Sequence, residues 1–224
     1  MYSTIRNAIQ SLVYKVIDPG VRGAVKIGIT PNFVTTLGMI GNAVGAGMLV
    51  YSSINGGKTA GDAMAVAAIV PDYAMVGWAG VVIIISSIMD MVDGYMARTA
   101  NLCSTFGAFY DSVLDRYCEL LTLSGLAFWF MANGLPWGAV VTFLSLIGSI
   151  MVSYVRARAE GLGIECKVGL MQRPERVVIT ILGMILCGIF SEIWCLYISQ
   201  GIIALFANIT AFHRILHVKS KCPL

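Results

Sequence analysis

The acidic residues of this 224-residue chain are concentrated in one apolar stretch, since five of the twelve fall between positions 90 and 119. Asp90 and Asp93 are spaced i,i+3, and Asp111 and Asp115 are spaced i,i+4, so each pair would share one helix face. The short connection at residues 96–105 would make the two helices antiparallel neighbours. We therefore expect four carboxylates to converge on one point.

Four carboxylates at close quarters repel one another and need a cationic partner. Ligation by oxygen alone suits a hard divalent ion, and we expect Mg²⁺ or Mn²⁺. The alternative is an interhelical network without metal, in which Arg98 and Arg116 pair with the aspartates. Charged groups at membrane depth cost about 2.5–3.5 kcal/mol each on insertion scales, and they usually mark function.

The composition indicates that these helices lie in a membrane. Hydrophobic residues make up 58% of the chain and charged residues 12%, with a mean hydropathy of +0.81. Soluble domains carry about 25% charged residues. This excludes a soluble enzyme and a disordered chain. The net charge of +3 does not suggest nucleic-acid binding, and six cysteines without a CxxC pair do not suggest a disulfide scaffold.

The chain offers six apolar segments near the length of about 20 residues that a spanning helix needs. We predict an all-α integral membrane protein that forms a single domain over residues 1–224, with a six-helix bundle over 33–212. The second predicted helix continues into Asp90 and Asp93, and Gly41 and Gly45 on the first form a small-residue face. The predicted spans are 33–54, 74–89, 106–131, 138–154, 177–190 and 194–212.

Residues 1–30 precede the first predicted span and resemble an amphipathic helix in the membrane interface. The alternative is a helix packed on the protein's own cytosolic side. Asp18-Pro19-Gly20 is expected to end this helix. Its apolar face would consist of Ile5, Ile9, Leu12, Val13 and Val16.

The distribution of basic residues predicts the orientation. The N-terminal segment, the two connections at 96–105 and 156–176 and the tail after Phe212 hold thirteen of the fifteen lysines and arginines. Basic residues favour the cytosolic side. We therefore expect a multi-pass protein of the cytoplasmic membrane, with both termini and the carboxylates facing the cytosol.

The acidic segment resembles the signature of the CDP-alcohol phosphotransferases. Residues 90–115 match DxxDGxxARx(7–8)GxxxDxxxD at all eight fixed positions, and the six-helix layout is also similar to that family. The resemblance implies an enzyme of phospholipid biosynthesis that transfers the phosphatidyl-type group of a CDP-linked lipid to an alcohol, with release of CMP. The resemblance also implies a homodimer, which close helix contact at Gly41 and Gly45 would fit.

The resemblance also implies roles for individual residues. Asp90, Asp93, Asp111 and Asp115 match the positions that bind two Mg²⁺ or Mn²⁺ ions, and Asp115 also matches the general base. The matching positions near the CDP moiety are Gly94, Arg98, Ser104, Gly107, Pro31, Asn32, Phe33 and Val34.

A second segment bears on the acceptor. The string from Ser153 to Gly163, followed by Arg173-Pro174-Glu175-Arg176, resembles prokaryotic phosphatidylinositol-phosphate synthases and their archaeal relatives, which make dialkyl lipids. The resemblance implies inositol 1-phosphate as acceptor, CDP-diacylglycerol or CDP-archaeol as donor, and a phosphate site of Arg156, Arg173, Arg176 and Lys167.

Other interpretations remain open at this stage. These basic residues could instead be cytosolic anchors of the spans. Glycerol 3-phosphate, used by phosphatidylglycerophosphate synthases, also needs an anion site. Buried carboxylates occur in ion or proton transporters as well, although interrupted helices and internal repeats, which are typical of transporters, are not visible here.

Overall fold

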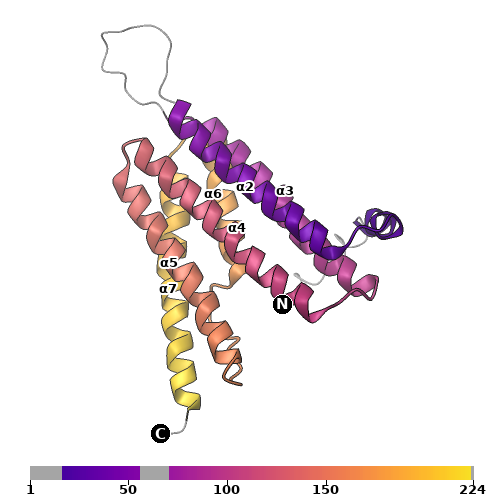
Figure 1. Ribbon diagram of the computed structural model, residues 1–224. Coiled ribbons are helices and arrows are strands. Elements are labelled where there is room, and N and C mark those ends of the chain that lie inside the picture. Colours follow the sequence, from indigo (N-terminus) through magenta and orange to yellow (C-terminus); the bar gives the residue numbers. More distant parts are fainter. Residues whose placement is uncertain (1–16, 56–70, 223–224) are drawn as a thin grey trace, which may run out of the picture. The chain divides into compact units, whose positions relative to one another are not determined.

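The computed structural model describes residues 17–55 and 71–222, and the regular elements of this part of the chain are all helices (Figure 1). Six long helices match the six predicted segments and continue past them, mostly at their polar ends. They are α2 (Pro31–Asn55), α3 (Tyr73–Thr99), α4 (Thr105–Ala132), α5 (Pro136–Glu160), α6 (Arg173–Phe190) and α7 (Trp194–Lys221).

Four of these helices, α2, α3, α5 and α7, are long and apolar enough to cross a membrane by length and composition. The other two carry more charge. α4 contains Asp111, Asp115, Arg116 and Glu119, and the 18 residues of α6 include three charged ones. An all-α membrane protein is therefore confirmed, with four of the six predicted spans meeting this criterion in the described residues.

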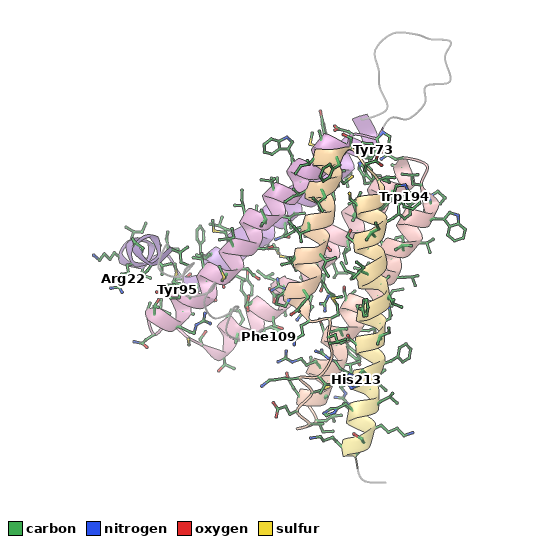
Figure 2. All side chains as sticks on the ribbon, turned by 180° about the vertical axis from the view of Figure 1, so that it is seen from behind. Arg22, Tyr73, Tyr95, Phe109, Trp194 and His213 are labelled. Atoms are coloured by element: carbon green, nitrogen blue, oxygen red, sulfur yellow. The ribbon has the colours of Figure 1, made fainter. Side chains whose placement is uncertain are left out.

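Residues 17–26 are also helical, and the prediction that Asp18-Pro19-Gly20 ends a helix is wrong. Arg22 Nε donates to Asp18 Oδ2 at 2.7 Å, and the Tyr95 hydroxyl of α3 donates to Asp18 Oδ1 at 2.8 Å (Figure 2). Val21 is buried against Val34 and Met96. The i,i+4 ion pair and the tertiary contacts with Tyr95, Val34 and Met96 together outweigh the local turn signal. The predicted apolar face from Ile5 to Val16 lies outside the described residues.

The chain divides into two compact units whose boundaries cut across α2, α3 and α4. The first unit comprises Met1–Gly41 and Ile85–Asp115, and the second comprises Asn42–Ile84 and Arg116–Leu224. Each unit has its own apolar cluster. Val21, Val34 and Met96 form that of the first, while Leu126, Trp129, Phe130 and Met184 belong to that of the second.

Within the second unit, α5 and α7 lie side by side (Figure 1). Gly148 allows this approach, since a Cβ there would lie 3.0 Å from Ala207 Cβ. The Ser145 hydroxyl donates to the Gln200 carbonyl at 2.7 Å. Small residues and interhelical hydrogen bonds are the usual means of joining helices in a membrane.

The small-residue face of α2 packs within the chain. In the first unit a Cβ on Gly41 would overlap the Ser86 side chain of α3, and in the second unit a Cβ on Gly45 would overlap Ile83. The close helix contact predicted for this face is confirmed. The homodimer that the resemblance implies stays a prediction, and the contacts of Gly41 and Gly45 with α3 are contacts within one chain.

Candidate functional site

Three of the four predicted metal ligands come together in the first unit. Asp90 and Asp93 on α3 and Asp111 on α4 each offer a carboxylate oxygen, and these atoms lie within 4.8 Å of one another. Asp93 is buried, and its Oδ2 accepts no hydrogen bond from the described residues. Buried carboxylate oxygens need compensation, and an all-oxygen group suits a hard divalent cation. The residues present therefore fit a Mg²⁺ or Mn²⁺ ion.

The connection between α3 and α4 brings these carboxylates together. Asn101 adopts a left-handed conformation with φ 55°, which asparagine tolerates, and Leu102 N–H donates to the Ala97 carbonyl at 2.9 Å. The Ser104 hydroxyl accepts a hydrogen bond from Gly107 N–H at 2.9 Å and caps the start of α4. α3 thus ends abruptly and α4 begins at once, as the short predicted connection requires.

A cavity of about 190 Å³ lies beside the carboxylates within the first unit. Most of the residues expected near the CDP moiety line it, and they come from the start of α2, the end of α3 and the start of α4. The lining residues are Pro31, Asn32, Thr35, Asp93, Gly94, Ala97, Arg98, Leu102, Cys103, Ser104, Gly107, Ala108 and Asp111.

Gly107 is the lining position where the absence of a side chain matters most. A Cβ there would lie 3.0 Å from Ser104 Oγ and 3.3 Å from Asn32 Oδ1, and both side chains also line the cavity. At Gly94 the nearest atom would be Arg98 Nη1 at 3.4 Å, an ordinary contact. Gly107 therefore keeps two polar side chains and the backbone of α4 close together on the cavity wall.

Phe33 and Val34 are not among the lining residues. The Phe33 side chain is exposed, and Val34 is buried against Val21 and Met96. Because successive helix residues point about 100° apart, Pro31 and Thr35 share a face that Phe33 and Val34 do not. Sequence reasoning missed Thr35, which the i,i+4 spacing from Pro31 would have indicated.

Asp115 lies one helical turn beyond Asp111 on α4 and is 8% exposed. It is outside the group of three carboxylates whose oxygens approach within 4.8 Å. Asp115 thus shares α4 with Asp111 but does not belong to the group that Asp111 forms with Asp90 and Asp93 of α3. A buried carboxylate one turn from a metal site can act as a base as well as a ligand.

The predicted phosphate-binding cations belong to the second unit, where two of them have weakly held partners. Arg156 Nε lies 2.9 Å from Glu160 Oε1, and Lys167 Nζ lies 3.3 Å from Glu165 Oε1. Both pairs are solvent-exposed, and such pairs contribute only about 0.2–1 kcal/mol. A phosphate could displace either glutamate at low cost. Arg173 is the first residue of α6 and is partly buried.

Arg176 differs from the other three because it is fully buried. Its Nε and Nη2 donate to the two carboxylate oxygens of Glu119 at 2.7 and 3.0 Å, and Nη1 donates to the Met171 carbonyl at 3.3 Å. Removing one partner of such a pair costs about 3–5 kcal/mol. This environment favours a positioning role for Arg176 over the predicted contact with a phosphate.

Comparison with known proteins agrees with these features. The family model of CDP-alcohol phosphatidyltransferase matches residues 28–212. The chain belongs to this family. The match spans the cavity, the three carboxylates and the four predicted cations.

Two curated relatives are phosphatidylinositol phosphate synthases. That of Mycolicibacterium smegmatis is 30% identical over 211 residues, covering 92% of this chain and 85% of the relative. That of Mycobacteroides abscessus is 33% identical over 148 residues, which cover 64% of this chain and 66% of the relative's length.

The phosphatidylinositol phosphate synthase of Mycobacterium tuberculosis has a similar fold. Its crystal structure with CDP-DAG bound has a TM-score of 0.74 at 26% identity, covering 91% of this chain and 94% of the other. A second structure of it, in complex with manganese and citrate, also gives a TM-score of 0.74 at 26% identity, covering 90% and 88%.

Sequence reasoning missed two residues of the second unit, Glu119 and Arg214. Glu119 continues the i,i+4 series of Asp111 and Asp115 on α4, so its spacing could have indicated that it lies on the same helix face as those residues. Arg214 stands inside the apolar α7 and is buried there. A charge in an apolar helix needs a partner, but the partner itself cannot be read from local sequence.

Proposed function

We propose that the protein transfers the phosphatidyl-type group of a CDP-linked lipid to a hydroxyl of inositol 1-phosphate and releases CMP. The observation that carries this proposal is the group Asp90, Asp93 and Asp111 at the edge of the cavity, within a motif of the family. The acceptor rests on the relatives and on the cations of the second unit. The donor is CDP-diacylglycerol or CDP-archaeol, and CDP-DAG is bound in the related M. tuberculosis structure.

We assign Asp90, Asp93, Asp111 and Asp115 as the residues that would hold two Mg²⁺ or Mn²⁺ ions. Such ions would offset the charge of the donor pyrophosphate and of the leaving CMP. The buried Asp93 Oδ2 and the spacing of the three oxygens support this assignment. Manganese in the related M. tuberculosis structure supports it as well.

Asp115 is assigned as the general base. Its carboxylate would take the proton of the attacking hydroxyl as the new oxygen–phosphorus bond forms. This new bond forms at the phosphorus atom that carries the lipid. The bond from the same phosphorus to the bridging oxygen of the pyrophosphate breaks, and CMP leaves with that oxygen and the electron pair of the bond. The burial of Asp115 supports this role, because it excludes competing water.

The rest of the cavity wall is assigned to the donor. Arg98 offers a planar fork for phosphate, and Asn32 and Ser104 offer polar groups next to the bare backbone of Gly107. Gly94 and Pro31 complete the predicted contacts in the lining. Phe33 and Val34 do not line the cavity, so they would affect donor binding only indirectly, by keeping the start of α2 in place.

Arg156, Lys167 and Arg173 are assigned to the acceptor phosphate. Exposed partners hold Arg156 and Lys167 loosely, so a dianionic phosphate competes well for them. Arg176 supports the site through its bond with Glu119. Glycerol 3-phosphate, the other acceptor expected from the sequence, serves as the matched alternative in the test below.

The proposed setting is a single domain in the cytoplasmic membrane. All six helices from α2 to α7 would cross it, with both termini and the site on the cytosolic side, where thirteen basic residues are predicted. The described part of the N-terminal segment, residues 17–30, would lie in the membrane interface. The protein would act as a homodimer among membrane lipids and without nucleic acid.

The test is CMP release by the purified protein with CDP-diacylglycerol and Mg²⁺. The acceptors compared would be inositol 1-phosphate, glycerol 3-phosphate, free inositol and serine at equal concentration. We expect release with inositol 1-phosphate to exceed that with free inositol and with serine at least about tenfold, the effect of one good charge-assisted contact with the phosphate. Release with glycerol 3-phosphate, which carries the same phosphate, should also be lower. Preferential use of glycerol 3-phosphate would assign the other phosphorylated acceptor. Absence of release with all four would contradict CDP-diacylglycerol as the donor, and CDP-archaeol with the same four acceptors would be the next comparison.

A further inference from the structure

The first unit contains a second cavity, of about 410 Å³, where the helix 17–26 meets the end of α3. None of the residues that line it lines the cavity assigned to the donor, so the two cavities are separate. Its wall combines two cations with apolar side chains. The lining residues are Val21, Arg22, Val25 and Lys26 of the helix, and Thr99 and Ala100 at the end of α3.

The two cations of this cavity can exchange their present surroundings for an anion. Arg22 and Lys26 are spaced i,i+4, so they share a helix face, and both are exposed. Arg22 Nε pairs with Asp18 Oδ2 at 2.7 Å, but exposed pairs of this kind are weak. Because the Tyr95 hydroxyl also donates to Asp18, at 2.8 Å, Asp18 would keep a partner if Arg22 turned to another anion. Lys26 makes no ion pair within the part of the chain that the structure describes.

The position of the cavity along α3 corresponds to the level of lipid headgroups. α3 is apolar and long enough to cross a membrane, and Thr99 is its last residue. At a rise of 1.5 Å per residue its 27 residues span about 40 Å, which is the thickness of a bilayer with its headgroup regions. Figure 2 shows the helix that carries Arg22 crossing the end of α3 near Tyr95, rather than running along it. With α3 across the bilayer, both cations would therefore lie at the interface between hydrocarbon and water.

The apolar side chains around the cations favour a lipid over a free anion. Val21 and Val25 form the apolar part of the cavity wall, and both belong to the apolar cluster of the first unit. Ile27, the residue after Lys26, is 77% exposed. An exposed apolar side chain beside two cations suits an amphipathic ligand, and basic pockets next to spanning helices bind anionic headgroups.

We propose that Arg22 and Lys26 bind the phosphate of an anionic membrane phospholipid whose acyl chains lie beside Ile27. This lipid is neither the donor nor the acceptor, and its binding does not depend on the proposed reaction. A lipid held here attaches the helix 17–26 and the end of α3 to the membrane surface. Since Arg98 of the donor cavity directly precedes Thr99, the same attachment steadies one wall of that cavity.

The test titrates the purified protein, in an uncharged detergent, with phosphatidylglycerol or with phosphatidylcholine of the same acyl chains. Native mass spectrometry gives the Kd of the first lipid bound. We expect the parent to bind phosphatidylglycerol more tightly than phosphatidylcholine. Arg22→Gln and Lys26→Gln should each weaken binding of phosphatidylglycerol about fivefold, and the double variant about 25-fold, while binding of phosphatidylcholine stays unchanged. The matched control is the double variant Lys219→Gln, Lys221→Gln, which loses two exposed cations at the end of α7 and should bind both lipids as the parent does.

A variant at Asp18 should have the opposite effect. Asp18→Asn removes the acid that competes for Arg22, but it leaves an oxygen that can accept from the Tyr95 hydroxyl. We expect this variant to bind phosphatidylglycerol about two- to fivefold more tightly than the parent, the range set by loss of one exposed ion pair.

Competition identifies the site and its ligand. Neither CMP with Mg²⁺ nor millimolar inorganic phosphate should displace phosphatidylglycerol. Displacement by CMP would place the lipid in the donor cavity, and displacement by phosphate would assign the two cations to a free anion. Either result would overturn the proposal, as would equal weakening in the control at Lys219 and Lys221. Lipid binding is measured without turnover, so a failure of CMP release with every acceptor would reject the proposed function and leave this site standing.

Discussion

The two units carry charge in different ways. In the first unit three carboxylates approach one another within 4.8 Å beside a cavity, and the residues that form this site lie within the short stretch 90–111 and the start of α2. In the second unit the central cations are buried against distant partners, as Arg176 is against Glu119 and Arg214 against Val152. The first arrangement concentrates like charge and requires an external cation. In the second unit, partners within the chain bind the buried arginines. Only the exposed ion pairs of Arg156 and Lys167 can readily exchange their glutamate for a ligand.

This difference predicts that metal removal gives the largest effect. EDTA should abolish CMP release, and added Mg²⁺ or Mn²⁺ should restore it. Asp90→Asn and Asp111→Asn should behave like the chelated protein. The control is Arg158→Gln, a change at an exposed residue near the end of α5, which should respond to EDTA as the parent does. Full activity in EDTA would mean that the carboxylates are neutralised by arginines instead.

Asp115→Asn should give the next largest effect. Loss of a general base lowers kcat by about 10²–10⁴-fold. Because Asp115 is outside the group of three carboxylates, the concentration of Mg²⁺ that gives half of the residual activity of Asp115→Asn should stay close to the value for the parent. A large increase in that concentration would show that Asp115 acts mainly as a metal ligand. Steady-state kinetics over a Mg²⁺ series measures both quantities.

The contrast between Arg176 and Arg156 sharpens the description of the second unit. Arg176→Met or Glu119→Leu should each destabilise the protein by about 3–5 kcal/mol, because each leaves a buried charge without its partner. The double variant should recover much of this loss. Arg156→Gln should leave thermal stability nearly unchanged, since its pair with Glu160 is exposed.

Kinetics of the same variants would complete this comparison. Arg156→Gln should raise KM for the acceptor by about 10–150-fold, the value of one charge-assisted contact. The opposite pattern, with Arg176→Met stable but weak in acceptor binding, would make Arg176 the direct phosphate ligand. Thermal unfolding in detergent and initial-rate kinetics distinguish the two cases.

The smallest effect concerns the cavity of the first unit. Cys103 is an exposed free thiol that lines it, whereas Cys222 is exposed near the C-terminus. CMP with Mg²⁺ should slow maleimide labelling of Cys103 by at least about threefold through simple occlusion, and it should leave Cys222 unaffected. Equal rates at Cys103 with and without CMP would place the nucleotide elsewhere.

The site residues of the first unit could be predicted from the sequence better than those of the second. The reason is the separation in sequence between the residues that interact. The fixed positions between Asp90 and Asp115 are close in sequence, so helix periodicity and one short connection were enough to predict the approach of three of the four carboxylates. Local spacing failed for Asp115, which lies outside this group, and where a neighbouring helix intervenes. The helix through Pro19 is held by Tyr95, and Val34 turns away from the cavity toward Met96.

The partners in the second unit could not be predicted in this way. Arg176 and Glu119 are 57 positions apart, and Arg214 lies 46 and 62 positions from its two acceptors. Neither distance leaves a periodic signal, because such contacts depend on which helices pack together. The presence and order of the helices α2 to α7 were predictable, since apolar segments of membrane length are local features, whereas their polar ends continue past those segments.

The most direct test of the central claim is the mass of the lipid product. Purified protein with CDP-diacylglycerol, Mg²⁺ and inositol 1-phosphate should form a lipid that carries diacylglycerol, two phosphates and one inositol, in amounts equal to the CMP released. Asp115→Asn should form little of it. A lipid product of the same mass with free inositol as the supplied acceptor is impossible, so that reaction serves as the blank. If inositol 1-phosphate yields no such lipid while glycerol 3-phosphate yields its own phosphorylated product, the acceptor assignment is contradicted.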